Sequence, residues 1–169
     1  IKKIKRVAKT IIDYRKKNYN VIVVSSAMSG VTNDLIKKSN EISDNFSESE
    51  HDVLVSSGEQ VACSLIAGRL IHEGYEARSW LSWQIPILTK GKYKNSKINQ
   101  INKTNIIKYL KKGGIPIITG FQGLNDENRI TTIGRGGSDA SAIMVAKFFK
   151  AERCIIYTKV EDVYTTDPN

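Results

Sequence analysis

The chain has 169 residues, within the range of about 100–200 that is usual for one domain. Its 40% apolar and 25% charged residues are typical of globular proteins and exclude a disordered chain, whereas its net charge of +9 suggests an anionic partner. No apolar run is long enough to span a bilayer, and the first residues lack the apolar stretch of a signal peptide. Two cysteines, Cys63 and Cys154, cannot form a disulfide scaffold, so we expect reduced thiols in a cytoplasmic protein without a membrane partner.

The first predicted element is an amphipathic helix over residues 2–17. Eight of the 26 basic residues fall within it, and apolar residues repeat between them at helical spacing. We interpret these charges as the solvated face of the helix and expect no nucleic acid partner. Binding of nucleic acid through this basic helix stays as the alternative.

The remaining elements alternate between strands and helices. In chain order we expect a strand over 21–24, a helix over 32–42, a polar loop over 43–52, a helix over 58–72, short strands over 75–79 and 84–88, and an exposed excursion over 90–103. There follow a helix over 105–112, a strand over 115–119, a turn over 120–123, a strand over 129–133, a helix over 138–150 and a strand over 154–157. This alternation predicts an α/β domain with a mainly parallel sheet, whose ligands bind beyond the carboxyl ends of the strands.

A glycine-rich segment precedes the last predicted helix, at residues 131–139 (TTIGRGGSD). Its glycines allow close approach of a ligand, and the free N–H groups of the helix start favour an anion. Arg135 can hold a carboxylate in two parallel bonds, and we expect Asp139 to orient a lysine. The alternative is a plain glycine turn in which Ser138 or Asp139 caps the helix. The segment matches neither the P-loop nor the G-x-G-x-x-G pattern.

Two further segments are candidate parts of a site. Glu59 can pair with a substrate ammonium group, or it can simply complement the dipole at a helix start. Residues 25–30 offer hydroxyl and N–H groups after a strand, as any strand-to-helix turn can. His51 and His72 have no partner at a suitable spacing and are expected at the surface, and no cluster predicts a protein-bound metal.

Six stretches together resemble the catalytic domain of the aspartate kinases, which belong to the amino-acid kinases. They are 24–33 (VSSAMSGVTN), 55–60 (VSSGEQ), 83–89 (WQIPILT), 120–123 (GFQG), 131–142 (TTIGRGGSDASA) and 157–168 (YTKVEDVYTTDP). The resemblance implies a three-layer α/β/α sandwich with a mainly parallel sheet, of which residues 1–169 are one partial domain, incomplete at both ends. It also implies phosphorylation of L-aspartate by ATP with Mg²⁺, giving 4-phospho-L-aspartate for lysine, threonine and methionine synthesis, and a homo-oligomer of the full-length protein.

The same resemblance assigns the site residues. Glu59 would contact the amino group of aspartate, Arg135 its α-carboxylate, and Ser138 and Asp139 would lie with Arg135 at the reacting centre. The remaining assignments are Ser26, Thr32 and Phe121 in the substrate pocket, and Thr158, Lys159, Tyr164, Asp167 and Pro168 at the nucleotide.

Three departures from the family pattern favour an alternative function. The family's Lys-Phe-Gly-Gly-Thr-type strand, whose lysine reaches the transferred phosphoryl group, would precede residue 1, so we expect a partial active site. Lys159 stands where the family has Asp, with Glu161-Asp162 in place of an Asp-Gly-like pair, and Asn169 stands where Arg is usual. The alternative is therefore a truncated or diverged module that binds nucleotide or aspartate without catalysis.

Overall fold

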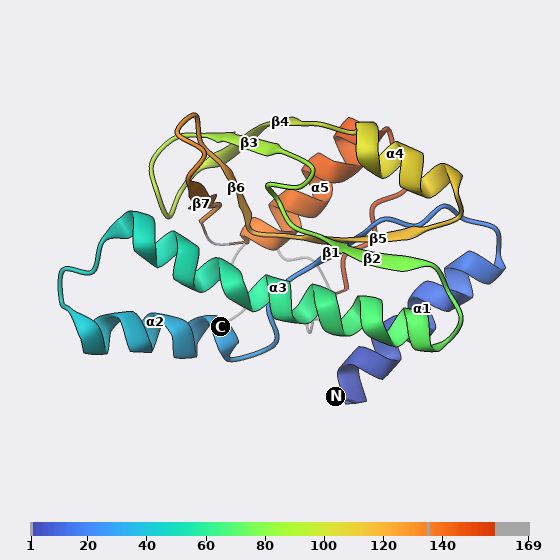
Figure 1. Cartoon of the computed structure of the whole chain (residues 1–169), viewed down its shortest axis with the longest axis horizontal. Helices are drawn as coiled ribbons and strands as arrows, with labels where there is room; N and C mark the ends of the chain where they lie inside the picture. Colours follow the sequence, from blue (N-terminus) through green and yellow to red (C-terminus); the bar gives the residue numbers. More distant parts are fainter. Residues whose placement is uncertain (1, 135, 158–169) are drawn as a thin grey trace, which may run out of the picture.

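The structure, a computed structural model, describes residues 2–134 and 136–157 (Figure 1). The helices are α1 (Lys2–Lys16), α2 (Val31–Ile42), α3 (Glu48–His72), α4 (Thr104–Lys111) and α5 (Gly137–Phe149). The strands are β1 (Val23–Ser25), β2 (Ala77–Trp80), β3 (Ile87–Lys90), β4 (Lys97–Ile101), β5 (Ile115–Thr119), β6 (Gln122–Leu124) and β7 (Ile130–Thr132). In the described part of the chain, no helix is both long and apolar enough to cross a membrane.

The strands form two sheets. The first has the order β1-β5-β2 and is entirely parallel, with Val24 beside Ile118 and Ser79 beside Ile117. The second has the order β4-β3-β6-β7, in which β3 and β6 are parallel and the two outer pairs are antiparallel. The parallel sheet places the carboxyl ends of β1 and β5 side by side, which is where α/β proteins bind ligands.

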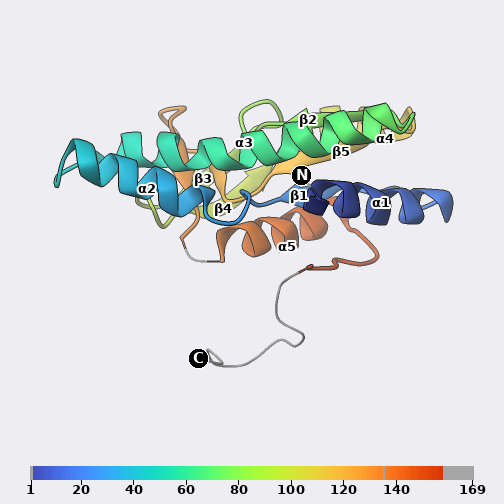
Figure 2. The ribbon, with the colours of Figure 1, turned by 90° about the horizontal axis from the view of Figure 1, so that it is seen from below.

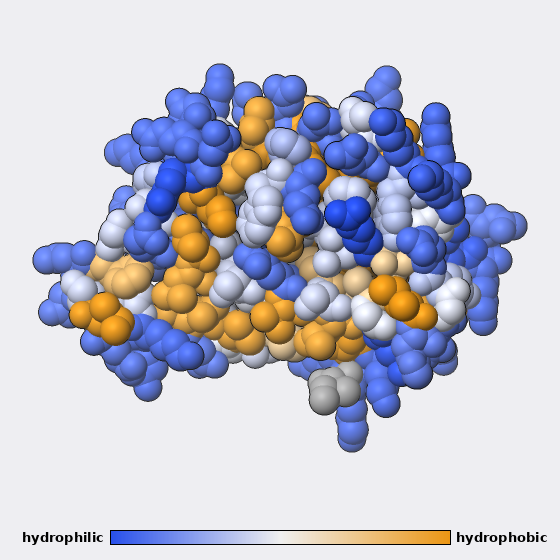
Figure 3. Space-filling model, viewed as in Figure 1, coloured by the Kyte–Doolittle hydropathy of each residue, from blue (hydrophilic) through white to orange (hydrophobic). Residues whose placement is uncertain are grey.

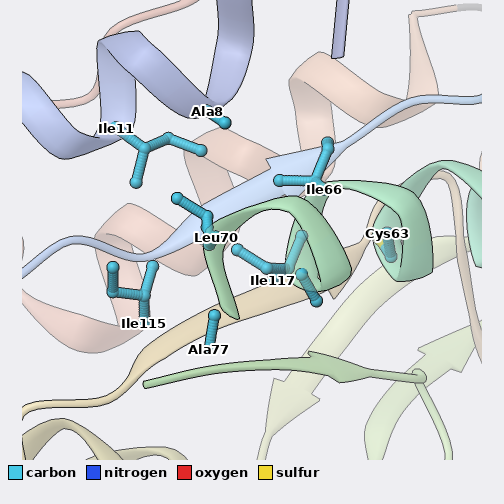
Figure 4. Close-up of a cluster of buried hydrophobic side chains, with 9 residues drawn as sticks. Ala8, Ile11, Cys63, Ile66, Leu70, Ala77, Ile115 and Ile117 are labelled. Carbon is cyan, nitrogen blue, oxygen red and sulfur yellow. The ribbon is translucent and has the colours of Figure 1, made fainter. Parts of the chain in front are cut away.

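Helices cover both faces of the parallel sheet, as Figure 2 shows with α3 on one side and α5 on the other. The predicted α/β/α sandwich is therefore confirmed. On the first face, Ile115 and Ile117 of β5 pack with residues of α1 and α3 (Figure 4). On the opposite face, Ile118 packs with Ile106 of α4 and Val145 of α5. The alternation along β5 follows from the two-residue repeat of a strand, which sends successive side chains to opposite faces.

Several element predictions need correction. Helix α3 begins at Glu48, ten residues before the predicted start at Gly58, so 43–52 is not one loop. The predicted excursion over 90–103 contains β4, which pairs with β3 as an antiparallel hairpin, and the predicted turn at 120–123 runs into β6. Residues 154–157 form no strand and are exposed, so that prediction is wrong.

Each error has a physical reason. Glu48 and Glu50 lie in the first turn of α3, where the helix dipole favours acidic side chains that otherwise resemble a polar loop. Strand β4 carries three exposed residues in five because it is an edge strand, so it lacks a continuous apolar run. Ile155, Ile156 and Tyr157 form an apolar run, but no strand of the described chain pairs with them.

Candidate functional site

A pocket of about 470 Å³ lies beyond the carboxyl ends of β1 and β5 and beside the first turn of α5. Six residues predicted from the sequence line it together: Ser26, Thr32, Glu59, Phe121, Ser138 and Asp139. Its other lining residues are Ala27, His51, Lys94, Thr132, Gly134, Gly136 and Gly137. The structure therefore brings into one cavity residues that span more than a hundred positions of the chain.

Close backbone packing holds the loops of this pocket together. The N–H of Gly120 donates to the carbonyl of Ser25 at 3.0 Å, which joins the loops that follow β5 and β1. A Cβ atom at Gly120 would lie 3.2 Å from the Cα of Ser138, so a larger residue would push α5 away. Glycine at this position thus allows the start of α5 to approach the sheet edge.

The glycine-rich segment enters α5 without a side-chain cap. Gly136 is the residue before the helix, has φ of 69°, and lies in the left-handed region that favours glycine. Neither Ser138 nor Asp139 caps the helix, so the predicted capping is wrong. Both side chains instead line the pocket, where they are available to a ligand.

Glu59 is buried at the side of the pocket, on the face of α3 that meets the loop after β1. Its Oε1 accepts a hydrogen bond of 3.0 Å from the N–H of Ala27, while its Oε2 has no partner among the described residues. Burial raises the pKa of the carboxyl from 4.5 to about 7, although the bond from Ala27 partly opposes this shift. A cationic group in the pocket would satisfy Oε2 and favour the ionised form.

Cys63 lies one turn further along α3, in the core. Burial and the nearby charge of Glu59 raise the pKa of its thiol to about 12. A thiol that stays protonated is a poor nucleophile, so Cys63 acts here as a small apolar side chain.

Phe121 and the glycine-rich segment form another part of the pocket wall. Phe121 has φ of 66°, a conformation that is uncommon for a residue with a side chain. Its N–H donates to the hydroxyl of Ser141 at 3.0 Å and its carbonyl accepts from the N–H of Ile133 at 2.9 Å. These two bonds hold the strained turn between α5 and the segment that follows β7.

Three pocket residues were missed by the sequence analysis: His51, Lys94 and Thr132. His51 is half-buried beside the pocket, so the surface prediction for it is wrong, whereas His72 is exposed as predicted. His51 and Lys94 come from the regions predicted as loop and excursion, where no regular spacing pointed to the site. Thr132 lies in the glycine-rich segment but was given no role of its own there. Had α3 been extended to Glu48, His51 would have fallen two turns before Glu59 on a continuous helix.

The other predicted site residues lie outside the described residues. They are Arg135, which follows Gly134 directly, and the nucleotide residues Thr158, Lys159, Tyr164, Asp167 and Pro168. Within the ranges 2–134 and 136–157, no three side chains of His, Cys, Asp or Glu converge as a metal site would require.

The chain matches known proteins over nearly its whole length. The model of the Amino acid kinase family matches residues 2–169. An aspartokinase of Rickettsia conorii is 50% identical over 171 residues, which cover 99% of this chain and 42% of that protein. An aspartokinase of Geobacillus stearothermophilus is 44% identical over 99% of this chain and 41% of that protein.

Solved structures agree with these sequence matches. The aspartate kinase of Synechocystis is 34% identical with a TM-score of 0.79, covering 94% of this chain and 26% of that one. Escherichia coli aspartokinase III, solved with aspartate and ADP, is 23% identical with a TM-score of 0.81 over 98% of this chain and 47% of its own, and it shares the fold. The chain spans about two fifths of the length of the curated relatives that it matches.

Proposed function

The chain belongs to the amino acid kinase family, and we propose that it carries the substrate site of an aspartate kinase. The reaction would transfer the γ-phosphoryl group of ATP to the β-carboxylate of L-aspartate, giving 4-phospho-L-aspartate and ADP. This product leads to lysine, threonine and methionine. Support comes from relatives named aspartokinase that are 44–50% identical across 99% of the chain.

The single observation that carries the proposal is the environment of Glu59. One oxygen of this buried carboxyl is bound by Ala27, and the other has no partner in the described part of the chain. An unpartnered buried acceptor is costly, and an ammonium group of an amino acid would remove that cost. The pocket beside it adjoins the start of α5, where free N–H groups favour an anionic group.

The other residues take roles that follow from their positions or from the family resemblance. Arg135 would hold the α-carboxylate of aspartate, and Ser26, Thr32 and Phe121 would shape the pocket around its carbon chain. Ser138 and Asp139 would lie at the reacting centre, where a β-carboxylate oxygen forms a bond to the γ-phosphorus as the bond to ADP breaks. The nucleophile is already an anion, so positioning and neutralisation of charge suffice without a general base.

The nucleotide would be held by Thr158, Lys159, Tyr164, Asp167 and Pro168. The described residues offer Mg²⁺ no cluster of carboxylate or imidazole ligands. We propose that the ion binds to the phosphates of ATP, since Mg²⁺ commonly keeps several waters and binds substrate phosphates. When bound there, it neutralises phosphate charge.

Trapping the acyl phosphate tests the proposal. The protein expressed from the complete reading frame around this chain is incubated with ATP, Mg²⁺, hydroxylamine and millimolar aspartate. We expect aspartyl hydroxamate, because hydroxylamine intercepts an acyl phosphate, and little product from Glu59→Ala, which cannot hold the ammonium group. Absence of hydroxamate from the unchanged protein contradicts an aspartate kinase.

The departures at Lys159 and Asn169 favour a second candidate, a module that binds nucleotide or aspartate without turnover. Calorimetry on the same protein distinguishes the two: heat of nucleotide binding without hydroxamate formation supports the module. We also propose, from the family resemblance, a cytoplasmic homo-oligomer with no nucleic acid partner.

A further inference from the structure

Asp52 is a fully buried carboxyl group that lies just behind the pocket wall, in the second turn of α3. Its Oδ2 accepts hydrogen bonds from the N–H of Thr132 at 2.8 Å and from the N–H of Lys94 at 2.9 Å. Its Oδ1 accepts a third bond, of 2.8 Å, from the hydroxyl of Thr132. The Nδ1 atom of the adjacent His51 lies 3.5 Å from the same oxygen.

These bonds join three elements that are far apart in the sequence. Asp52 comes from α3, Lys94 from the loop between β3 and β4, and Thr132 from the end of β7. The last two residues line the pocket, and the carbonyl of Lys94 accepts a bond of 3.1 Å from the N–H of Gly134. Asp52 is thus connected through Lys94 and Thr132 to the first glycine of the glycine-rich segment.

A carboxylate suits this position because it only accepts hydrogen bonds, and two backbone N–H groups and a hydroxyl converge on it. A buried carboxyl that only filled space would be worse than an apolar residue of the same size. Lys94 also has φ of 63°, so its backbone is held in an uncommon conformation by the contacts of this loop. The group therefore fixes backbone positions at the pocket wall.

We propose that Asp52 is a positioning residue, which holds Thr132, Lys94 and the start of the glycine-rich segment in the geometry needed for phosphoryl transfer. The inference rests on the proposed function for its catalytic consequence, while the placement of the segment can be tested separately. Displacement of reacting groups by about 1 Å can cost about a hundredfold in rate, so loosening this wall would act mainly on kcat. Glu59 is held by Ala27 and not by Asp52, so the contact proposed for the substrate ammonium group stays.

Three variants of the complete protein test this role. Asp52→Ala removes all three hydrogen bonds that the carboxylate accepts from Thr132 and Lys94. Asp52→Asn can keep both backbone bonds through its carbonyl oxygen and donate its amide N–H to the hydroxyl of Thr132. Ile66→Val is the matched control, because it loosens the core on the same helix and lies in the cluster with α1, away from the pocket.

We expect hydrogen exchange in the peptide over 132–137 to become at least about tenfold faster in Asp52→Ala, with 115–119 unchanged. Below the melting temperature, kcat should fall about 10–100-fold, by more than KM for aspartate rises. Asp52→Asn should keep the exchange rate over 132–137 and kcat within about threefold of the values for the protein without substitutions. The reason is that hydrogen bonds, rather than the charge of Asp52, hold the pocket wall. Ile66→Val should lower the melting temperature and leave both exchange over 132–137 and kcat as they are.

The proposal is overturned if Asp52→Ala, while folded, keeps the exchange rate over 132–137 or changes KM alone. It is also overturned if Asp52→Asn is as impaired as Asp52→Ala. Should Asp52→Ala not fold, Thr132→Val decides, because it removes only the hydroxyl bond and keeps the N–H; unchanged exchange there refutes the role. If the protein without substitutions forms no hydroxamate, the proposed function is contradicted. The hydrogen-exchange rates then still test whether Asp52 positions the glycine-rich segment.

Discussion

The carboxyl group of Glu59 couples the pocket to folding stability. Burial raises its pKa from 4.5 to about 7, so the folded protein holds a proton on this group at pH values where the unfolded chain has lost it. Its contribution to stability is fully present below pH 4.5 and is lost as the pH rises through about 7. Above that range, the ionised carboxyl destabilises the ligand-free fold by an amount on the order of 3 kcal/mol.

Glu59→Gln should therefore stabilise the ligand-free protein at pH 8 and have little effect at pH 5. The amide is neutral at both pH values and can still accept the bond from Ala27, so only the cost of the buried charge is removed. Urea unfolding at the two pH values measures the difference. Glu41→Gln serves as the control, because it makes the same substitution at an exposed side chain on α2. An equal effect of Glu59→Gln at both pH values would refute the raised pKa of Glu59 as the cause.

At the scale of elements, α3 connects the pocket with the core. It spans 25 residues, and Gly58 lies where the helix passes the loop after β1. A Cβ atom there would come within 2.8 Å of the Cβ of Ala27 and 3.2 Å of Val31. The absence of a side chain at Gly58 is what lets Glu59 reach the N–H of Ala27.

Two glycine substitutions on this helix should have opposite effects. Gly58→Ala should lower the free energy of unfolding by about 1–3 kcal/mol, because the overlap with Ala27 and Val31 outweighs the better helix propensity. Gly68→Ala, with nothing within 4 Å, should raise it by about 0.5–1 kcal/mol. Chemical denaturation measures both. Stabilisation by Gly58→Ala would show that the two segments are not in close contact.

The sequence predicts an element well when its apolar residues show one simple arrangement, either a single apolar face or complete burial. Helices α1 and α4 and strand β5 appear within one or two residues of their expected bounds, because each has one apolar face or is buried throughout. Helix α3 is harder to delimit, since apolar side chains also lie on its outward face (Figure 3), where Val61 and Leu65 are exposed. Its first turns are polar, so they lack the apolar stripe beside polar residues that marks an amphipathic helix in a sequence.

The residues of the candidate site were likewise predicted only where a local sequence pattern pointed to them. The glycine-rich segment was recognised because glycines before a helix start have a local physical meaning. Glu59 was recognised from an expected helix start at Gly58, but α3 begins at Glu48, so Glu59 does not complement a helix dipole there. Asp52 was missed because its partners, Thr132 and Lys94, are brought to it only by the packing of α3 against β7 and the β3–β4 hairpin. Contacts that depend on register between distant segments leave no periodic signal in one sequence.

At the scale of the whole molecule, the excess positive charge is spread over solvated surface. Of the eight basic residues within positions 2–17, seven are exposed, while Ala8 and Ile11 of α1 face α3 in the core. The eighth, Arg15, donates to the carbonyls of Tyr19 and Gly113 at 2.7 and 3.1 Å, so it ties α1 to the loop after α4. These charges therefore accompany the packing of α1 against the core.

Nucleic acid should therefore bind only weakly and only at low salt. A positive surface attracts DNA or RNA through counterion release, and this attraction falls steeply between about 50 and 200 mM salt. In filter binding we expect retention at low salt that disappears near about 150 mM, and weaker retention of a Lys5→Glu, Arg6→Glu, Lys9→Glu variant. Submicromolar, saturable binding at about 150 mM salt would instead identify α1 as a nucleic acid surface, since nonspecific attraction alone does not reach such affinity at that ionic strength.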